Sequence, residues 1–122
     1  MGESQVQEPT FGTVDSILAA PDVGSEEMFI PEWGCKIRIQ GLTQRQRGDI
    51  RVEATRDGQP IPEIVTLLMF IEGVREPKFE RMHFGQLQEK ASGVVDRVVD
   101  RITTLSGMTE EDRKRMMARF PG

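Results

Sequence analysis

Hydrophobic and polar residues alternate along two neighbouring segments in the first third of the chain. Cys35, Ile37 and Ile39 alternate with charged or amide side chains, which is the two-residue period of a strand with one buried face. Residues 28–30 show the same period, and a short Pro-Glu-Trp-Gly link connects the two segments. The pattern therefore predicts an antiparallel β-hairpin over residues 27–42, with Cys35 facing inward as a small, inert side chain.

The segment after the hairpin begins with a helix signal. Thr43 followed by Gln46 forms a capping-box pattern, which predicts a helix start. Residues 48–54 contain a glycine and alternate as a strand does, so helix and strand both remain open there, with helix favoured. The apolar run over residues 62–71 favours a buried helix, with a buried strand as the alternative.

Apolar residues recur at spacings of three and four from Phe84 to Leu105, which predicts one long amphipathic helix. Its opposite face carries mixed acidic and basic residues and is predicted to be a solvated surface. The apolar stripe can pack inside the domain or pair two subunits, and the internal core is favoured. Thr109 then starts a last helix, which has acidic residues in its first turn and ends near Phe120.

The beginning of the chain has a different character. Residues 1–10 are polar without periodicity, and residues 1–12 are predicted to be a disordered N-terminal segment. Val14, Ile17 and Leu18 share one helical face, which predicts a short helix over residues 13–20 that docks on the domain.

Together these elements predict an α+β fold that is mainly helical. An N-terminal antiparallel β-hairpin is followed by a small bundle of about four helices. The whole forms a single domain over residues 13–120, with its helical part over residues 43–120. A chain of 122 residues is long enough for one such domain.

Charge and composition narrow the classes of function. A net charge of −4 argues against a nucleic-acid binder, because phosphate contacts need clustered Lys and Arg. No apolar run is long enough to span a membrane, and the first residues lack the pattern of a secretory signal. The single cysteine fits a reducing compartment, so a cytoplasmic protein is expected.

Residues capable of catalysis are scarce. His83 and Cys35 are the only His and Cys, and they lie far apart in the sequence, so no metal site is predicted. His83 is expected to be partly exposed and not catalytic. The chain has no glycine-rich phosphate loop and no serine nucleophile motif. We therefore predict no catalytic, cofactor-binding or metal-binding residues, and a binding protein instead of an enzyme.

Four segments of the chain, in their order and spacing, resemble one known family. They are Thr13-Val14-Asp15-Ser16-Ile17-Leu18-Ala19-Ala20; Ile30-Pro31-Glu32-Trp33-Gly34 leading into Lys36-Ile37-Arg38-Ile39 and Leu42-Thr43; Phe70-Ile71-Glu72-Gly73-Val74 running into Pro77 and Phe79; and Leu87-Gln88-Glu89-Lys90 with Ile102-Thr103-Thr104-Leu105-Ser106-Gly107-Met108-Thr109. This arrangement is similar to that of the tail assembly chaperones of long-tailed bacteriophages.

The resemblance implies an assembly factor that acts in the cytoplasm of the infected bacterial host. It would bind and solubilise the tape measure protein before tail tube subunits polymerise around it, then leave, so that it is absent from the mature virion. The implied partners are the tape measure protein, a longer frameshifted form of the same protein, and further copies of this chain. Neither nucleic acid, nor a membrane, nor a cofactor is expected.

Such a chaperone needs adaptable apolar surfaces. The candidate partner-binding residues are Trp33 at the hairpin tip and Met116, Met117 and Phe120 on the last helix. In the alternative interpretation Trp33 anchors the core and the other three close the domain.

Two other classes compete with a chaperone. One is a structural tail or head-tail completion protein that is retained in the particle, with the stripe from Phe84 to Leu105 as a permanent subunit interface. The other is a small transcriptional regulator that uses Gly107 as the turn between two helices, which the net charge disfavours.

Overall fold

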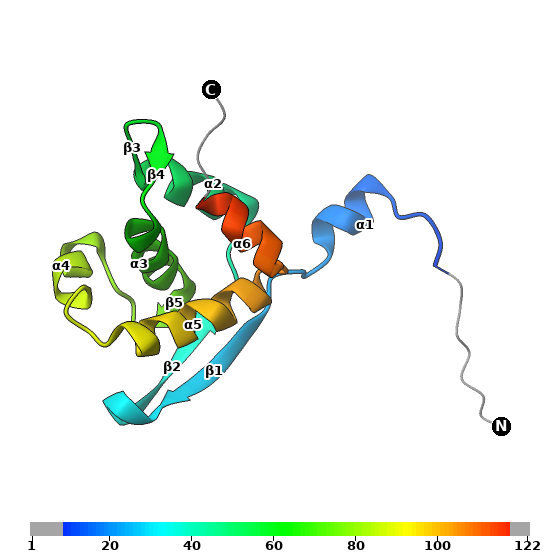
Figure 1. Ribbon diagram of the computed structural model, residues 1–122. Helices are drawn as coiled ribbons and strands as arrows, with labels where there is room; N and C mark the ends of the chain where they lie inside the picture. The colour runs from blue at the N-terminus through cyan, green and yellow to red at the C-terminus, as the bar shows by residue number, and fades with distance from the viewer. Residues whose placement is uncertain (1–8, 118–122) are drawn as a thin grey trace.

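A computed structural model describes residues 9–117 and confirms the α+β class (Figure 1). Within that range, helices accompany a three-stranded antiparallel sheet and a two-stranded ribbon. The elements are α1 (Val14–Ala19), β1 (Ser25–Ile30), η1 (Pro31–Trp33), β2 (Cys35–Gln40), α2 (Gln44–Glu53), β3 (Thr55–Arg56), β4 (Gln59–Pro60), α3 (Pro62–Gly73), β5 (Val74–Glu76), η2 (Arg81–His83), α4 (Phe84–Leu87), α5 (Ser92–Leu105) and α6 (Glu110–Met116).

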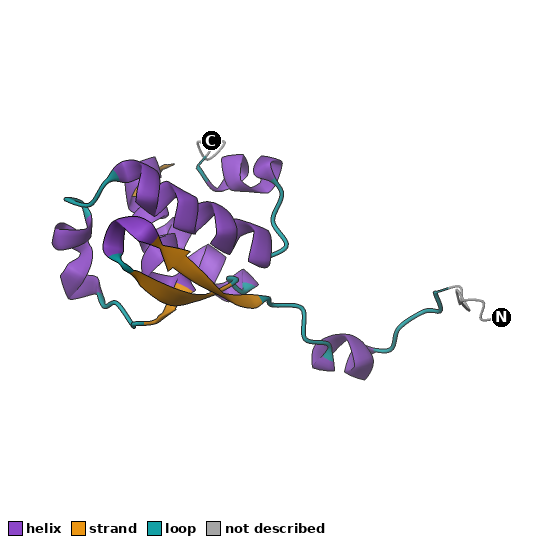
Figure 2. Ribbon diagram, turned by 90° about the horizontal axis from the view of Figure 1, so that it is seen from below, coloured by secondary structure: helices purple, strands orange, loops and turns teal. Residues whose placement is uncertain are grey.

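The predicted hairpin is formed by β1 and β2, and a third strand joins it. Met28 pairs with Ile37 across the hairpin, and a 3-10 turn that ends at Gly34 (φ 65°) connects the strands. The short strand β5 pairs with β2 on its other side, which gives the order β1-β2-β5. The helices cover one face of this sheet, as Figure 2 shows, and Phe29 lies exposed on the other.

Both segments with an open assignment are helices. The capping box of Thr43 and Gln46 is present and begins α2, and Gly48 lies in that helix where a Cβ would meet open space. The apolar run forms α3, whose side chains are buried along most of its length. Helices α3 and α5 pack together at the centre of the core, where Phe70 and Val98 are fully buried.

The single long helix expected from Phe84 to Leu105 is instead two helices, α4 and α5, separated at Gln88–Ala91. The residues at the break are polar or small, so a continuous helix would have no apolar face there to hold it against the core. The bundle after the hairpin therefore has five α-helices within the described residues, where about four were predicted.

A close approach of backbone joins the start of the hairpin to the end of α5. The amide of Gly24 donates to the carbonyl of Leu105 (3.1 Å), and the amide of Gly41 donates to the carbonyl of Gly24 (2.8 Å). A Cβ on Gly41 would lie 2.3 Å from the Leu105 carbonyl oxygen, so a side chain does not fit there. We call these three residues the glycine junction.

Candidate partner-binding surfaces

The segment before the glycine junction stands apart from the body of the molecule (Figure 1). We call residues 11–22 the arm. It contains α1, which begins with a capping box between Thr13 and Ser16, and none of the helix residues is buried. The short helix was predicted correctly, whereas its docking on the domain was not.

The large apolar side chains of the arm are exposed. Phe11 is 101% exposed and Leu18 is 79% exposed. Val14 (73%) and Ile17 (64%) lie with Leu18 at helical spacings of three and four on α1, and Phe11 precedes the helix; we call these four side chains the stripe. Isolated apolar side chains are common on protein surfaces, but four together on one short segment mark an interaction surface.

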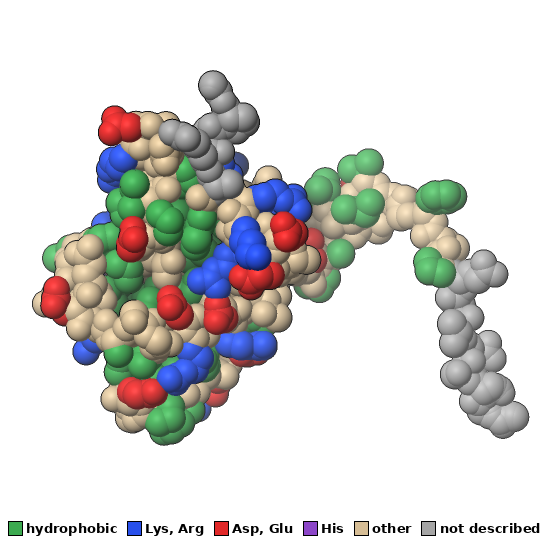
Figure 3. Space-filling view, in the orientation of Figure 1, with side chains coloured by type: hydrophobic (Ala, Val, Ile, Leu, Met, Phe, Trp, Pro, Cys, Tyr) green, Lys and Arg blue, Asp and Glu red, His purple; other side chains and the backbone are tan. Residues whose placement is uncertain are grey.

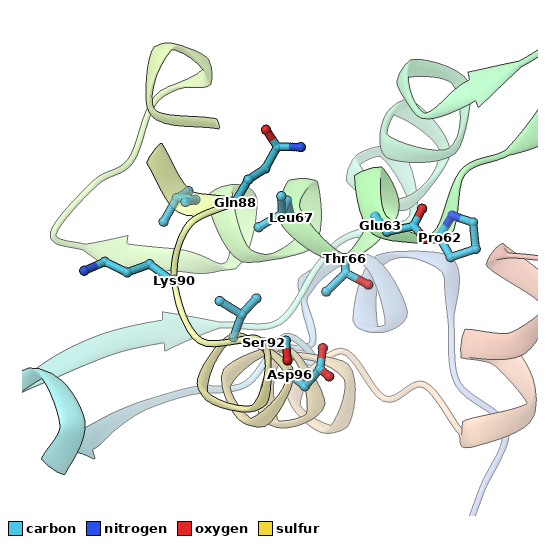
Figure 4. Close-up of a pocket in the computed structure, with 10 residues that line it drawn as sticks. Pro62, Glu63, Thr66, Leu67, Gln88, Lys90, Ser92 and Asp96 are labelled. Atoms are coloured by element: carbon cyan, nitrogen blue, oxygen red, sulfur yellow. The ribbon is translucent and has the colours of Figure 1, made fainter. Parts of the chain in front are cut away.

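A second candidate surface is a hollow of about 420 Å³ between α3 and α5, which we call the α3–α5 groove (Figure 4). Its floor is apolar, because Leu67, Leu87 and Val95 are between 5% and 7% exposed. In Figure 3, apolar side chains gather over α3 beside the charged surface of α5 and α6. The groove is lined by Pro62, Glu63, Thr66, Leu67, Leu87, Gln88, Lys90, Ser92, Val95 and Asp96.

The groove exists because the expected long helix is broken. Leu87 ends α4 and turns into the core, and the chain then crosses to Ser92 at the start of α5, so the crossing forms one wall. The sequence analysis missed this site. The signal that could have found it is the polar run of residues 88–90, which interrupts the apolar stripe.

Of the four residues predicted to bind a partner, the three in the described part of the chain do not form one surface. Trp33 is half-buried, and its ring meets that of Phe70 edge-on, with centroids 6.1 Å apart. Met116 is fully buried, so the prediction that it faces a partner is wrong for this conformation, because its side chain fills the core beneath α6. Met117 is half-buried against the core, and Phe120 lies outside the described residues.

Cys35 and His83 occupy places that suit structural roles. Cys35 is exposed, contrary to the inward position predicted, because it opens β2 at the hairpin tip opposite Ile30, at the end of the sheet. His83 is half-buried, and its Nδ1 accepts a hydrogen bond from the amide of Glu80 (2.9 Å). Over residues 9–117, no group of three or more His, Cys, Asp and Glu side chains could hold a metal ion.

Bidentate ion pairs connect the hairpin to α5. Arg97 donates to both carboxylate oxygens of Glu32 (3.0 and 2.7 Å), and Arg101 donates to both of Glu26 (2.9 and 2.8 Å). The hydrogen bonds from Arg97 lower the pKa of Glu32 from 4.5 to about 2. The charged face of α5 is therefore exposed as predicted, but it also holds the hairpin in place.

A second ionic cluster lies on another part of the surface. Arg81 donates to Glu53 of α2 (2.8 and 2.9 Å) and to Glu72 of α3 (2.9 Å). Both oxygens of Glu53 accept from Arg81, whereas Glu72 accepts from Arg81 with one oxygen and from the side-chain amide of Gln46 (3.3 Å) with the other, so these contacts join α2 and α3 to Arg81 at the surface.

Comparisons with known proteins returned no match among protein-family models, curated proteins or solved structures. In the part of the chain that the structure describes, no helix is both long and apolar enough to cross a bilayer.

Proposed function

We propose that this protein is a tail assembly chaperone whose α3–α5 groove binds apolar helical segments of a tape measure protein. The observation that carries the proposal is the groove itself, with its apolar floor of Leu67, Leu87 and Val95. The order of sequence segments that resembles the tail assembly chaperones supports it.

The shape and chemistry of the groove suit many similar clients. An amphipathic helix binds by laying its apolar face into a groove, and the energy comes from side chains three and four residues apart. The other lining residues include three uncharged polar ones, Thr66, Gln88 and Ser92, and three charged ones, so the apolar floor has a polar rim. A shallow apolar groove of this kind discriminates little between sequences, which a protein that coats a long rod requires.

The wider proposal follows the family resemblance. The chaperone acts in the cytoplasm of an infected bacterium, cooperates with a longer frameshifted form, and is absent from the finished particle. A structural particle component is less well supported, because the apolar side chains of α5 that would form its permanent interface, such as Val98 and Ile102, are fully buried inside this domain.

Co-expression with the tape measure protein of the same genome tests the proposal. We expect the wild-type chain to keep the rod soluble and to co-purify at several copies per rod. Thr66→Arg places a charged side chain in the groove, where it should exclude one large apolar side chain of the tape measure protein. Burial of such a side chain contributes roughly 1.5–3 kcal/mol, so the amount of tape measure protein that co-purifies should fall at least about ten-fold.

The matched control is Thr104→Arg on the exposed face of α5, which should bind as the wild type does. Equal binding by both variants would remove the groove from the proposal. Failure of the wild type to solubilise the rod, with recovery of the protein at fixed copy number from purified particles, would favour the structural component.

A further inference from the structure

We infer that the arm of one copy of this chain lies in the α3–α5 groove of a second copy. The inference deepens the proposed function and rests on it, because it uses the same groove. In the absence of a tape measure protein, the arm of a neighbouring copy occupies the groove, and the tape measure protein displaces that arm when it binds.

The arm needs a partner to be a stable helix. Helix α1 has only six residues, and isolated helices shorter than about 12–15 residues are marginal in water. Its capping box fixes where the helix starts but buries nothing. The stripe formed by Phe11, Val14, Ile17 and Leu18 is the part of the arm that burial would stabilise.

The arm does not point toward its own groove. Gly24 is bonded to Leu105 at the last turn of α5, whereas the groove is lined by Ser92 and Val95 in the first turn. Leu105 and Val95 are ten residues apart, which is about 15 Å along the helix. Figure 1 shows the arm leaving the body beside the C-terminal end of α5.

The charges of the arm and the groove are complementary at one end. Residues 9–22 contain Asp15 and Asp22 and no Lys or Arg. Lys90 forms no ion pair within the described part of the chain. Asp15 borders the apolar stripe beside Leu18, so a stripe seated on the groove floor can place this carboxylate against Lys90.

The acidic groups of the groove fix the direction of the arm. Glu63 lies at the end of the groove opposite Lys90, as Figure 4 shows, and Asp96 lines the α5 side. Repulsion from Glu63 and Asp96 therefore disfavours the reverse orientation, in which Asp15 would lie at the Glu63 end.

The contact area predicts a weak, reversible association. The four stripe side chains expose on the order of 500 Å² of apolar surface, below the roughly 800 Å² per partner of standard interfaces. Because arm and groove are different surfaces at opposite ends of α5, the contact is head-to-tail, and such a contact either closes, as a ring or a reciprocal pair, or continues from copy to copy.

Sedimentation of the full chain without any tape measure protein tests the inference. We expect the mass to rise above the monomer as concentration increases from about 1 μM to about 1 mM, as a contact of this size predicts. Leu18→Glu should weaken this association about 10- to 100-fold, because burial of one Leu is lost and a charge is added. Ala19→Glu, on the other face of α1, is the matched control and should leave association unchanged.

A charge exchange identifies the groove as the acceptor. Asp15→Lys and Lys90→Glu should each weaken association about two- to five-fold, as expected for an exposed ion pair. The double variant should recover the wild-type association. Loss without recovery would overturn the assignment of the groove.

Other outcomes would also overturn the inference. A wild-type chain that stays monomeric at about 1 mM, above the range expected for a weak interface, excludes pairing between copies. Hydrogen exchange that shows a protected arm in that monomer would assign the arm to its own body. If self-association fails while tape measure protein still co-purifies, the inference falls and the proposed function stands. If the chain self-associates as expected but the tape measure protein does not co-purify, the inference stands and the proposed function falls.

Discussion

Gly41 shows how one missing side chain sets the course of the chain. Its Cα lies so near the end of α5 that an added Cβ would meet the Leu105 carbonyl carbon and oxygen at 2.5 and 2.3 Å. These are backbone atoms, which cannot rotate away as the end of a flexible side chain can. The glycine junction is therefore a steric requirement of the packing between the hairpin and α5.

Gly41→Ala should lower the free energy of unfolding by about 1–3 kcal/mol, the typical range of overpacked sites. Gly48→Ala is the matched control, since nothing lies within 4 Å of its added Cβ on α2. It should raise stability by up to about 1 kcal/mol, because Ala favours helix more than Gly does. Urea denaturation measures both, and equal effects would mean that the junction tolerates a side chain.

Local signals in the sequence were enough for some residues and not for others. Thr43 and Gln46 cap α2 as predicted, because a capping box depends only on its own four residues. The exposure of Cys35 and the burial of Met116 depend on which distant elements cover them. Periodicity within a segment carries no information about that cover.

At the scale of elements, ionic contacts hold the hairpin against α5. Glu32 and Glu26 come from the turn and from β1, and their partners Arg97 and Arg101 lie one turn apart on α5. The pKa values of both carboxyl groups are lowered, chiefly by hydrogen bonds from these arginines. Each carboxylate is therefore favoured in its charged form when the protein is folded.

This arrangement predicts acid sensitivity. The pKa of Glu32 is about 2 in the folded protein and near 4.5 when unfolded. Its contribution to stability is thus fully present above about pH 4.5 and is lost as the pH falls toward 2. Thermal unfolding should show that Glu32→Gln is destabilised relative to wild type at pH 7, with a smaller difference at pH 2. A difference independent of pH would exclude the ion pair as the cause.

Elements built from distant partners escaped the sequence analysis. Strand β5 has three residues, and its pairing with β2 joins positions such as Arg38 and Glu76. No short window contains both strands. The break between α4 and α5 was missed for a different reason, since Leu87, Ala91 and Val94 keep helical spacing although the residues from 88 to 90 between them are polar.

At the scale of the whole molecule, the structure is a packed body with a projecting arm. The body holds the core residues from Ile30 to Met116, and the arm contributes none of them. The α+β class and the short first helix could be predicted from sequence, because both follow from local periodicity. The separation of the arm could not, since the same apolar stripe would suit a docked helix.

Deletion of residues 1–22 should leave the body folded. We expect a melting temperature within about 3 °C of the full chain at micromolar concentration, because every described residue from 9 to 22 is exposed. Deletion of residues 1–26 also removes Gly24 and Glu26, with their hydrogen bonds to Leu105 and Arg101. The melting temperature should then be lower than that of the chain without residues 1–22. A large loss on the shorter deletion would mean that the arm packs on its own body.

During synthesis, the glycine junction can form only after the ribosome has made Leu105. Gly24 and Gly41 emerge early and can bond to each other as soon as the hairpin forms, but Leu105 is translated some sixty residues after Gly41. Contacts between such distant positions form late in folding. A nascent chain therefore displays its arm while α5 is still unmade, and translation that stops before Leu105 yields a hairpin with nothing to close against.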